Sequence, residues 1–341
     1  MDESALNDAI ADLLARTGSR TAGLRIQPCT VGGNNRVYRV EAGGRVMAAK
    51  SYFRHPSDPR DRLDSEYRFL QCANASGIEC VPGTIARDQD AGIALYDFIE
   101  GRRLQPDELR ATHVDQARDF FSRLNDAGTR MLGASLPDAS EACFSIQEQL
   151  SLVDARIAHL AGMPVTSRLE EQALSFINRL KRVWAMLREQ VLAGCGRHGI
   201  DPLAHLVRGE RCISPSDFGF HNAIVTHGGA LVFVDFEYAG WDDPAKTVGD
   251  FFCQPEIPVQ ARYLEQFLAS ALACCPGGES LAHRARLLLP VFQVKWCCIV
   301  LNDFLPASFK RRRFADPSLH SAERKRLQLE KAQRIMQALP A

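Results

Sequence analysis

The feature that most limits the fold is a pair of short apolar runs within residues 214–244. The runs 222–226 and 231–234 are rich in β-branched and other apolar side chains, and the sequence His-Gly-Gly at 227–229 separates them. Glycine adopts the positive φ that a tight turn requires, so the stretch predicts a β-hairpin. Because a hairpin brings its two outer ends together, the residues at those ends should meet in the fold.

Polar residues stand at these ends. Asn222 opens the first run, Asp235 follows the second, and Asp217 lies in the segment that leads into the hairpin. Oxygen atoms converging in this way suit a hard cation such as Mg²⁺. Phosphoryl transfer from a metal-bound nucleotide needs one carboxylate to orient the attacking hydroxyl, and an Asn and an Asp to hold the metal. Singly, such residues are more often turn formers. Together, in this order, they favour a small-molecule kinase.

The stretch resembles the aminoglycoside phosphotransferase and choline kinase superfamily, whose hallmark is HGDxxxxN followed by a hydrophobic strand pair and DFE or DFD. Asp217, Asn222 and the sequence Asp-Phe-Glu at 235–237 match this pattern. The resemblance extends over roughly residues 25–305. It implies an α+β, protein-kinase-like fold with an antiparallel β-sheet N-lobe and a mainly helical C-lobe, and it implies ATP and Mg²⁺ as cofactors.

The sequence departs from the family pattern in two places. Pro215 and Ser216 stand where the family has His-Gly, and the family's histidine usually supports the metal-binding loop. Thr247 stands where the family usually has an aspartate, and Asp250 is the expected substitute. Neither departure removes a group that would touch metal, phosphate or acceptor.

Residues 1–100 are expected to form the N-lobe. Apolar residues at helical spacing predict a leading helix over 5–16. Five runs have the composition of antiparallel strands: 24–30, 36–41, 45–52, 83–87 and 92–96. A glycine-bearing loop between the first two can place backbone N–H groups on phosphate oxygens, although such a turn is often only a hairpin. The candidate cofactor-binding residues in this loop are Gly32, Gly33, Asn34 and Asn35.

Lys50 ends an apolar run, so its ammonium should emerge where the kinase pattern places the lysine that contacts the α- and β-phosphates. Residues 61–75 predict a helix with Glu66 near its middle. The resemblance implies that a glutamate of this helix pairs with the lysine, and Glu66 is the preferred candidate. Asp61 and Asp64 remain alternatives, and all three acids could instead lie on a solvated face.

The segment that follows the fifth strand resembles the hinge of the family, in which the backbone meets the edge of adenine. Asp97, Phe98 and Ile99 are therefore the candidate adenine-binding residues. Gly101 would let the chain turn into the second lobe, although an ordinary loop glycine is the alternative.

Residues 101–341 are expected to form the C-lobe, with a catalytic loop at 214–222 and a metal-binding segment at 235–244. Glu237 is a third candidate metal ligand because, on an extended chain, it points the same way as Asp235. The residues that follow, to 244, are expected to line the mouth of the cleft. Apolar residues at helical spacing predict helices over 114–132, 146–160, 169–192, 259–273 and 281–305.

Composition excludes some functions. Lys and Arg balance Asp and Glu at 41 each, so no overall field favours nucleic acid as a partner. The apolar stretch 287–301 contains Pro290 and Lys295 and is too short to span a bilayer, so we expect no membrane span. The first residues do not have the pattern of a signal peptide. The eleven cysteines lack metal-binding spacing, which favours reduced thiols and a cytoplasmic protein.

The end of the sequence is basic. Residues 310–313 read Lys-Arg-Arg-Arg, and a basic helix is expected over 321–339. Such a run is usually a solvated face. The alternative is contact with an anionic acceptor, an acidic partner or a membrane surface.

The sequence therefore predicts ATP-dependent transfer of the γ-phosphate to a hydroxyl of a small molecule: a sugar, an amino alcohol or an aminoglycoside-like acceptor. A catalytically weak nucleotide-binding module with a regulatory or scaffold role is the alternative, and transfer of AMP is a third possibility. An aminoglycoside pocket would require carboxylates, whereas choline would require an aromatic cage. Residues that offer either are Tyr238, Trp241, Asp242, Asp243, Glu256, Trp296 and Asp303.

Overall fold

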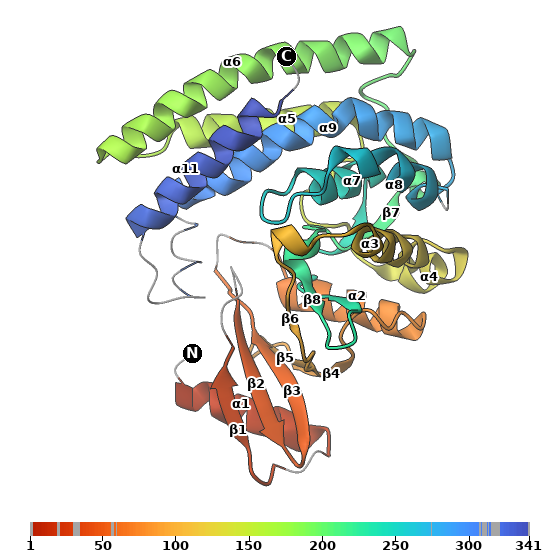
Figure 1. Ribbon diagram of the computed structural model, residues 1–341. Helices are drawn as coiled ribbons and strands as arrows, with labels where there is room; N and C mark the ends of the chain where they lie inside the picture. Colours follow the sequence, from red (N-terminus) through yellow and green to blue (C-terminus); the bar gives the residue numbers. More distant parts are fainter. Residues whose placement is uncertain are drawn as a thin grey trace.

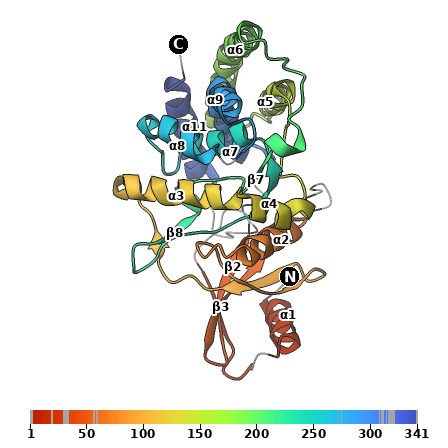
Figure 2. The same cartoon turned by 90° about the vertical axis from the view of Figure 1, so that its right-hand side faces the viewer.

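The computed structural model describes residues 3–18, 21–29, 35–55, 58, 60–273, 275–306, 308, 312, 314 and 321–339. The chain forms the two lobes that the sequence predicts, a small β-sheet lobe at one end and a larger helical lobe at the other (Figure 1). In the view of Figure 2, α3 and α4 lie between the sheet and the helices α5, α6 and α9. The boundary expected at residue 100 stays a prediction.

The N-lobe contains a five-stranded antiparallel sheet in the order β1-β2-β3-β5-β4, as expected. Its strands are β1 (Arg25–Pro28), β2 (Arg36–Ala42), β3 (Arg45–Ser51), β4 (Thr84–Asp88) and β5 (Ile93–Asp97). Helix α1 (Glu3–Arg16) covers one face and helix α2 (Arg62–Ala75) the other.

Successive side chains of β5 point to opposite faces of the sheet, so this strand contributes to the core on both sides. Ile93 and Leu95 pack with the apolar residues of α1, whereas Ala94 and Tyr96 belong to the core on the α2 side. Lys50 of β3 lies directly opposite Ala94 in the register. Because paired residues of an antiparallel ladder share a face, Lys50 is directed toward α2 and the cleft.

The C-lobe is mainly helical. Its helices are α3 (Ala111–Leu124), α4 (Ala127–Leu132), α5 (Ile146–Ala161), α6 (Arg168–Arg197), α7 (Pro244–Cys253), α8 (Leu264–Ala271), α9 (Gly278–Leu301) and α11 (Ser321–Gln337). Short 3₁₀ turns lie at Pro106–Glu108, Gly133–Ser135, Arg208–Glu210, Phe220–Asn222, Ala261–Tyr263 and Asn302–Phe304. Two small sheets complete the lobe: β6 (Arg102–Arg103) with β8 (Ala223–Val225) and β9 (Leu231–Phe233), and β7 (Cys212–Ser214) with β10 (Gly240–Asp242).

The prediction of a single helix over 114–132 is wrong, because the helix is interrupted at Asn125. The Asn125 side chain donates to the carbonyl of Ile213 at 3.0 Å and accepts from its amide at 2.8 Å. Asp126 then caps the new helix by accepting from the amide of Thr129 at 2.7 Å. Both residues bond to backbone more readily than they continue a helix, and so α3 ends where it meets β7.

An aromatic cluster fills the core beneath the catalytic loop. The ring of Phe251 in α7 stacks on Phe218 with centroids 4.8 Å apart, and on Phe267 at the same distance. Phe220 meets it edge-on at 5.2 Å. Phe218 and Phe220 belong to the predicted catalytic loop, so their rings anchor the loop in this core.

Replacing Phe251 with alanine is expected to lower the free energy of unfolding by about 3–5 kcal/mol, because a fully buried ring leaves a cavity that its neighbours fill only partly. Urea denaturation measures the loss. Phe252→Ala is the matched control, since this neighbouring ring is only partly buried. Equal losses for the two variants would show that the cluster has no special role.

The basic helix α11 lies beside α9 and α6 (Figure 1) and buries Leu329 and Ala332 against them. Contact of this helix with an anionic ligand or partner stays a prediction. Several of its cations, however, do not lie on a solvated face but pair with acids of the C-lobe. These pairs are Arg324 with Asp303, Lys325 with Glu170 and Lys331 with Glu256. Arg312, from the expected basic run, also pairs with Asp303. The rest of that run, Lys310, Arg311 and Arg313, lies outside the described residues.

Docking of α11 is expected to weaken in acid. Hydrogen bonds from Lys325 and from the amide and hydroxyl of Thr166 lower the pKa of Glu170 to about 2. Since this pKa lies below the ordinary value of 4.5, the contribution to stability is complete above pH 4.5 and is lost as the pH falls toward 2. Unfolding of Glu170→Gln, followed with urea from pH 7 to pH 2, should therefore depend less on pH in that range. The exposed neighbour Glu171, changed to Gln, should leave the profile unaltered.

One described helix is long and apolar enough to cross a membrane. It covers Gly278–Phe304, although 67% of its most apolar window is buried inside the fold. The stretch expected to be too short for a span is therefore part of a longer helix, α9, which packs against α7, α5 and α11. The ten cysteines in the described part of the chain are free, and seven are buried.

Candidate active site

The β8–β9 hairpin has the predicted form. Ala223 pairs with Phe233, and the amide of Val234 donates to the carbonyl of Asn222 at 2.9 Å. The pairing therefore continues to the outer end of the hairpin, where Asn222 and Asp235 lie together. Asp235 has a φ of 69°, so the chain turns sharply just after β9.

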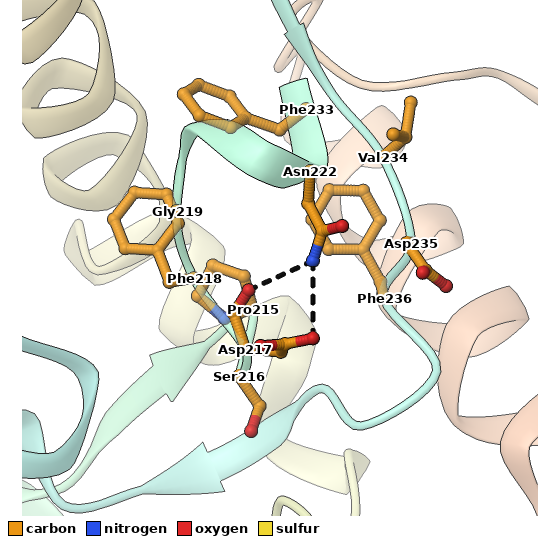
Figure 3. Close-up of a pocket in the computed structure, with 10 residues that line it drawn as sticks. All are labelled: Pro215, Ser216, Asp217, Phe218, Gly219, Asn222, Phe233, Val234, Asp235 and Phe236. Atoms are coloured by element: carbon orange, nitrogen blue, oxygen red, sulfur yellow. Dashed lines mark hydrogen bonds between the residues drawn. The ribbon is translucent and has the colours of Figure 1, made fainter. Parts of the chain in front are cut away.

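The catalytic loop joins β7 to this hairpin. Ser216 and Asp217 both have a φ of 47°, in the left-handed region that non-glycine residues seldom adopt. The side-chain amide of Asn222 donates to the carbonyl of Asp217 at 3.1 Å and to its carboxylate at 3.4 Å (Figure 3). The loop and the hairpin are thereby tied together at the two residues that the sequence singles out.

A small hollow opens between the loop and the hairpin. About 170 Å³ of space, including the part open to solvent, is lined by residues 215–219, 222 and 233–236. The Asp217 and Asp235 side chains are 33% and 30% exposed. Both carboxylates can therefore be reached from solvent.

His221 contacts the predicted base, a role that the sequence reasoning missed. Its Nε2 lies 3.3 Å from a carboxylate oxygen of Asp217. Burial lowers the pKa of His221, but the Asp217 carboxylate outweighs this effect, and the pKa is raised. Burial likewise opposes ionisation of Asp217, yet His221 and Asn222 leave its pKa lowered. The carboxylate is held ionised. The spacing of four residues across a short turn was the available signal.

Lys50 lies between two carboxylates. Its Nζ is 2.6 Å from Glu66 of α2 and 2.5 Å from Asp235 of the hairpin. Burial lowers the pKa of Lys50, but the two carboxylates outweigh it and the pKa is raised. The ammonium therefore stays charged, in contact with both the helix glutamate and a predicted metal ligand.

Glu66, and neither alternative acid, is the partner of Lys50. Its carboxylate also accepts from the hydroxyl of Tyr52 at 2.8 Å and from the amide of Phe236 at 3.2 Å. Asp61 instead caps α2, and Asp64 pairs with arginines at the surface. Glu66 is thus fixed by contacts from the sheet and from the segment after β9.

Glu237 does not lie on an extended chain, so the geometric reason given for it is wrong. The positive φ of Asp235 breaks the alternation that would point the two side chains the same way. Glu237 is 2% exposed, accepts from the side-chain amide of Asn35 and lies 3.7 Å from the Nε of Arg62. Its role as a metal ligand stays a prediction. Arg62 is a second buried charge that the sequence reasoning missed.

The proposed phosphate loop is only partly described. Gly32, Gly33 and Asn34 lie outside the described residues. Asn35 is 2% exposed, and its side-chain oxygen accepts from the amide of Phe53 at 3.1 Å. The contacts of Asn35 therefore join the start of β2 to the segment after the hairpin.

The hinge segment leaves the sheet at Asp97, the last residue of β5, whose amide donates to the carbonyl of Gly83 at 2.9 Å. Phe98 follows, with the guanidinium of Arg39 5.4 Å from its ring centroid, and Ile99 continues toward β6. A Cβ at Gly101 would lie only 2.3 Å from the carbonyl oxygen of Val225. Glycine is needed there because this segment, the predicted hinge, passes directly over the β8–β9 hairpin.

Most of the segment expected at the mouth of the cleft is buried instead. Trp241 is 3% exposed, and Asp242 and Asp243 are fully buried, because β10 pairs with β7 inside the lobe. Asp242 binds Lys246, and Asp243 binds Arg284 at 2.8 Å. Glu256 and Asp303 pair with basic residues near the C-terminus, so all four acids considered for an acceptor pocket already have partners.

The donor set at the end of the hairpin fits Mg²⁺. Asn222 uses its amide nitrogen toward Asp217, which leaves its amide oxygen for a cation beside the Asp235 carboxylate. No group of three His, Cys, Asp or Glu side chains suited to a metal occurs within the described residues. Mg²⁺ does not need such a cluster, because it usually binds one or two carboxylates together with substrate phosphates and water.

Comparison with known proteins decides the family. Residues 25–285 match the phosphotransferase enzyme family. The chain belongs to this family. No curated protein matches it in sequence. Similar solved structures include a choline kinase from Cryptosporidium parvum (TM-score 0.57, 14% identity, 98% of this chain and 97% of that one). A spectinomycin phosphotransferase in complex with ADP and spectinomycin has a TM-score of 0.59 at 10% identity, with 99% of both chains covered. The choline kinase of Streptococcus pneumoniae has a TM-score of 0.54 at 14% identity, with 98% and 99% covered.

These structures share the protein-kinase-like fold with the chain. At sequence identities of 10% to 14%, the similarity establishes the fold alone. This member of the phosphotransferase enzyme family therefore combines a confirmed fold with a site in which Lys50, Glu66, Asp217, Asn222 and Asp235 lie close together. The structure brings these five residues together, and their roles stay predictions.

Proposed function

We propose that this phosphotransferase transfers the γ-phosphate of ATP to a hydroxyl group of a small molecule. The observation that carries the proposal is the convergence of Asp217, Asn222 and Asp235 at one end of the hairpin, with the ammonium of Lys50 2.5 Å from Asp235. A base, a set of oxygen donors and a buried cation at one place are the groups that phosphoryl transfer requires.

Asp217 is the catalytic residue. Its ionised carboxylate accepts a hydrogen bond from the acceptor hydroxyl, orients that oxygen toward the phosphate and takes up its proton. His221 and Asn222 stabilise the ionised form and fix its direction. Lys50 binds the nucleotide phosphates and offsets the negative charge that develops on them, and Glu66 holds the lysine in place.

Asn222 and Asp235 would hold Mg²⁺, with Glu237 as a further candidate. When bound, the cation would neutralise part of the charge of the nucleotide phosphates. Adenine would lie against the backbone of Asp97, Phe98 and Ile99, and the loop with Gly32, Gly33, Asn34 and Asn35 would cover the phosphates. ADP in the similar spectinomycin phosphotransferase supports the choice of an adenine nucleotide.

The acceptor is an uncharged or singly charged alcohol, either a sugar or an amino alcohol. A polycationic aminoglycoside needs several free carboxylates, whereas Asp242, Asp243, Glu256 and Asp303 all bind the chain's own cations. Trp296 remains near the base, with its ring centroid 6.3 Å from that of His221. We expect the reaction to take place in the cytoplasm and to involve no nucleic acid.

The test is transfer of labelled γ-phosphate from ATP, with Mg²⁺, to a panel of sugars, choline, ethanolamine and aminoglycosides. A labelled small product supports the proposal and identifies the acceptor class. Its mass distinguishes addition of phosphate from addition of AMP. Magnesium-dependent ATP binding without any product would contradict the proposal and favour the alternative of a regulatory nucleotide-binding module.

A further inference from the structure

The two departures from the family pattern, far apart in the chain, meet in space. Ser214 and Ser216 belong to the segment where the family has its histidine, and Lys246 and Thr247 lie in the first turn of α7. The hydroxyl of Thr247 lies 2.8 Å from that of Ser214, and Nζ of Lys246 donates to the hydroxyl of Ser216 at 3.0 Å. All four residues are buried.

We propose that Lys246 is a positioning residue for Asp217 and acts through the hydroxyl of Ser216. The inference rests on the proposed function, because it concerns the placement of the base. Together with the Thr247–Ser214 contact, this contact supports the catalytic loop where the family uses a histidine.

Lys246 is well placed to hold the loop because it is itself fixed. It is 1% exposed, binds Asp242 four residues before it and lies 3.5 Å from Asp250 four residues after it. The helix that carries it begins at Asp243, which accepts from the amide of Ala245 at 2.8 Å and is anchored by Arg284. An ammonium held in this way presents a fixed hydrogen-bond donor to the loop.

The loop needs such a donor because its backbone is strained. Ser216 and Asp217 both have a φ of 47°, which a residue with a Cβ adopts only when its surroundings hold it there. The amide of Ser216 donates to the hydroxyl of Ser214 at 3.0 Å, and Lys246 holds the side chain. Without the lysine contact, Ser216 can relax to negative φ, which turns the next peptide and moves the Asp217 carboxylate away from Asn222. A displacement of about 1 Å at a reacting group can lower a rate about 10²-fold.

Three variants test the inference. Ser216→Ala removes the acceptor of the hydrogen bond from Lys246 but keeps the Cβ that disfavours a positive φ. The kcat should fall about 10²-fold, with little change in ATP binding. Ser216→Gly should cost only about tenfold, because glycine adopts a positive φ without a Cβ clash. The double variant Asp242→Asn/Lys246→Met removes the lysine without leaving a charged carboxylate at position 242. It should lower kcat about as much as Ser216→Ala does. A protein that carries Ser216→Ala together with the double variant should show no further loss of kcat.

Trp184→Phe is the matched control. It removes a partly buried hydrogen bond, from Nε1 of the buried Trp184 to Asp154 at 2.6 Å, in a helix that is not part of the loop. This variant should melt at a lower temperature with kcat unchanged. If Ser216→Ala behaves in the same way, or if its effect adds fully to that of the double variant, the inference is wrong.

A crystal structure of the Ser216→Ala protein separates this inference from the proposed function. Loss of the Asn222–Asp217 contact and a negative φ at residue 216 are expected, whether or not an acceptor has been found. An unchanged loop would overturn the inference. Absence of transfer by the unaltered protein would contradict the proposed function alone.

Discussion

The Asp217→Asn protein is expected to lose about 10²- to 10⁴-fold in kcat, because asparagine cannot take up the proton of the acceptor hydroxyl. The substitution keeps the shape of the side chain, so the loop should stay in place. Binding of ATP with Mg²⁺ should change little, since Lys50 and Asp235 are untouched. Single-turnover transfer of labelled phosphate measures the chemical step, and calorimetry measures binding.

Asp119→Asn is the control for this experiment. Asp119 has a side chain that is 68% exposed, lies in α3 and pairs only with Arg118 at the surface. It should keep full activity. Comparable transfer by the Asp217 and Asp119 variants would show that Asp217 is not the base.

The Lys50→Met protein is expected to lose about 10²- to 10³-fold in kcat/KM, because a fixed positive charge on the phosphates is absent in the transition state. Unlike the change at Asp217, this one should also weaken ATP binding. It leaves the Glu66 carboxylate, 5% exposed, without its cation, and breaking a buried pair costs about 3–5 kcal/mol of stability. A melting curve should accompany the kinetics.

Lys50→Arg separates the loss of charge from unfolding. It keeps the cation and should melt near the temperature of the unaltered protein, while the bulkier guanidinium misplaces the charge and activity stays low. Lys181→Met, at an exposed position of α6, is the neutral control. Unaltered ATP binding by a folded Lys50→Met protein would contradict the role given to this lysine.

The parts of the site that the sequence predicted are those formed by residues close together in the chain. Asn222 and Asp235 follow from two strands and a glycine turn, and the five N-lobe strands follow from their apolar runs and intervening turns. The pairing of Lys50 with Glu66 required the family resemblance, because nothing local distinguishes Glu66 from Asp61 or Asp64 in the same helix.

The parts that were missed depend on contacts between distant segments. Asp243 looked like an exposed acid because its counter-ion, Arg284, becomes a neighbour only when α7 and α9 pack. The basic residues of α11 looked available to a partner for the same reason. The helix predicted over 114–132 is interrupted at Asn125 because Ile213, far along the chain, offers this side chain both a backbone donor and a backbone acceptor. The counter-ion of Asp242, by contrast, is Lys246, four residues further along the chain, and this local spacing was a signal that went unused.

The position of Lys50 has a consequence for how the two lobes move. Lys50 belongs to the N-lobe sheet and Asp235 to the C-lobe hairpin, so their 2.5 Å contact bridges the cleft. The phosphates of a bound nucleotide would bind Lys50, and the cation would bind Asp235. Binding then exchanges a bond between the lobes for bonds to the ligand, and opening of the cleft and capture of the nucleotide become one linked equilibrium. The lysine that would hold the phosphates is thus also one of the residues that join the lobes beforehand.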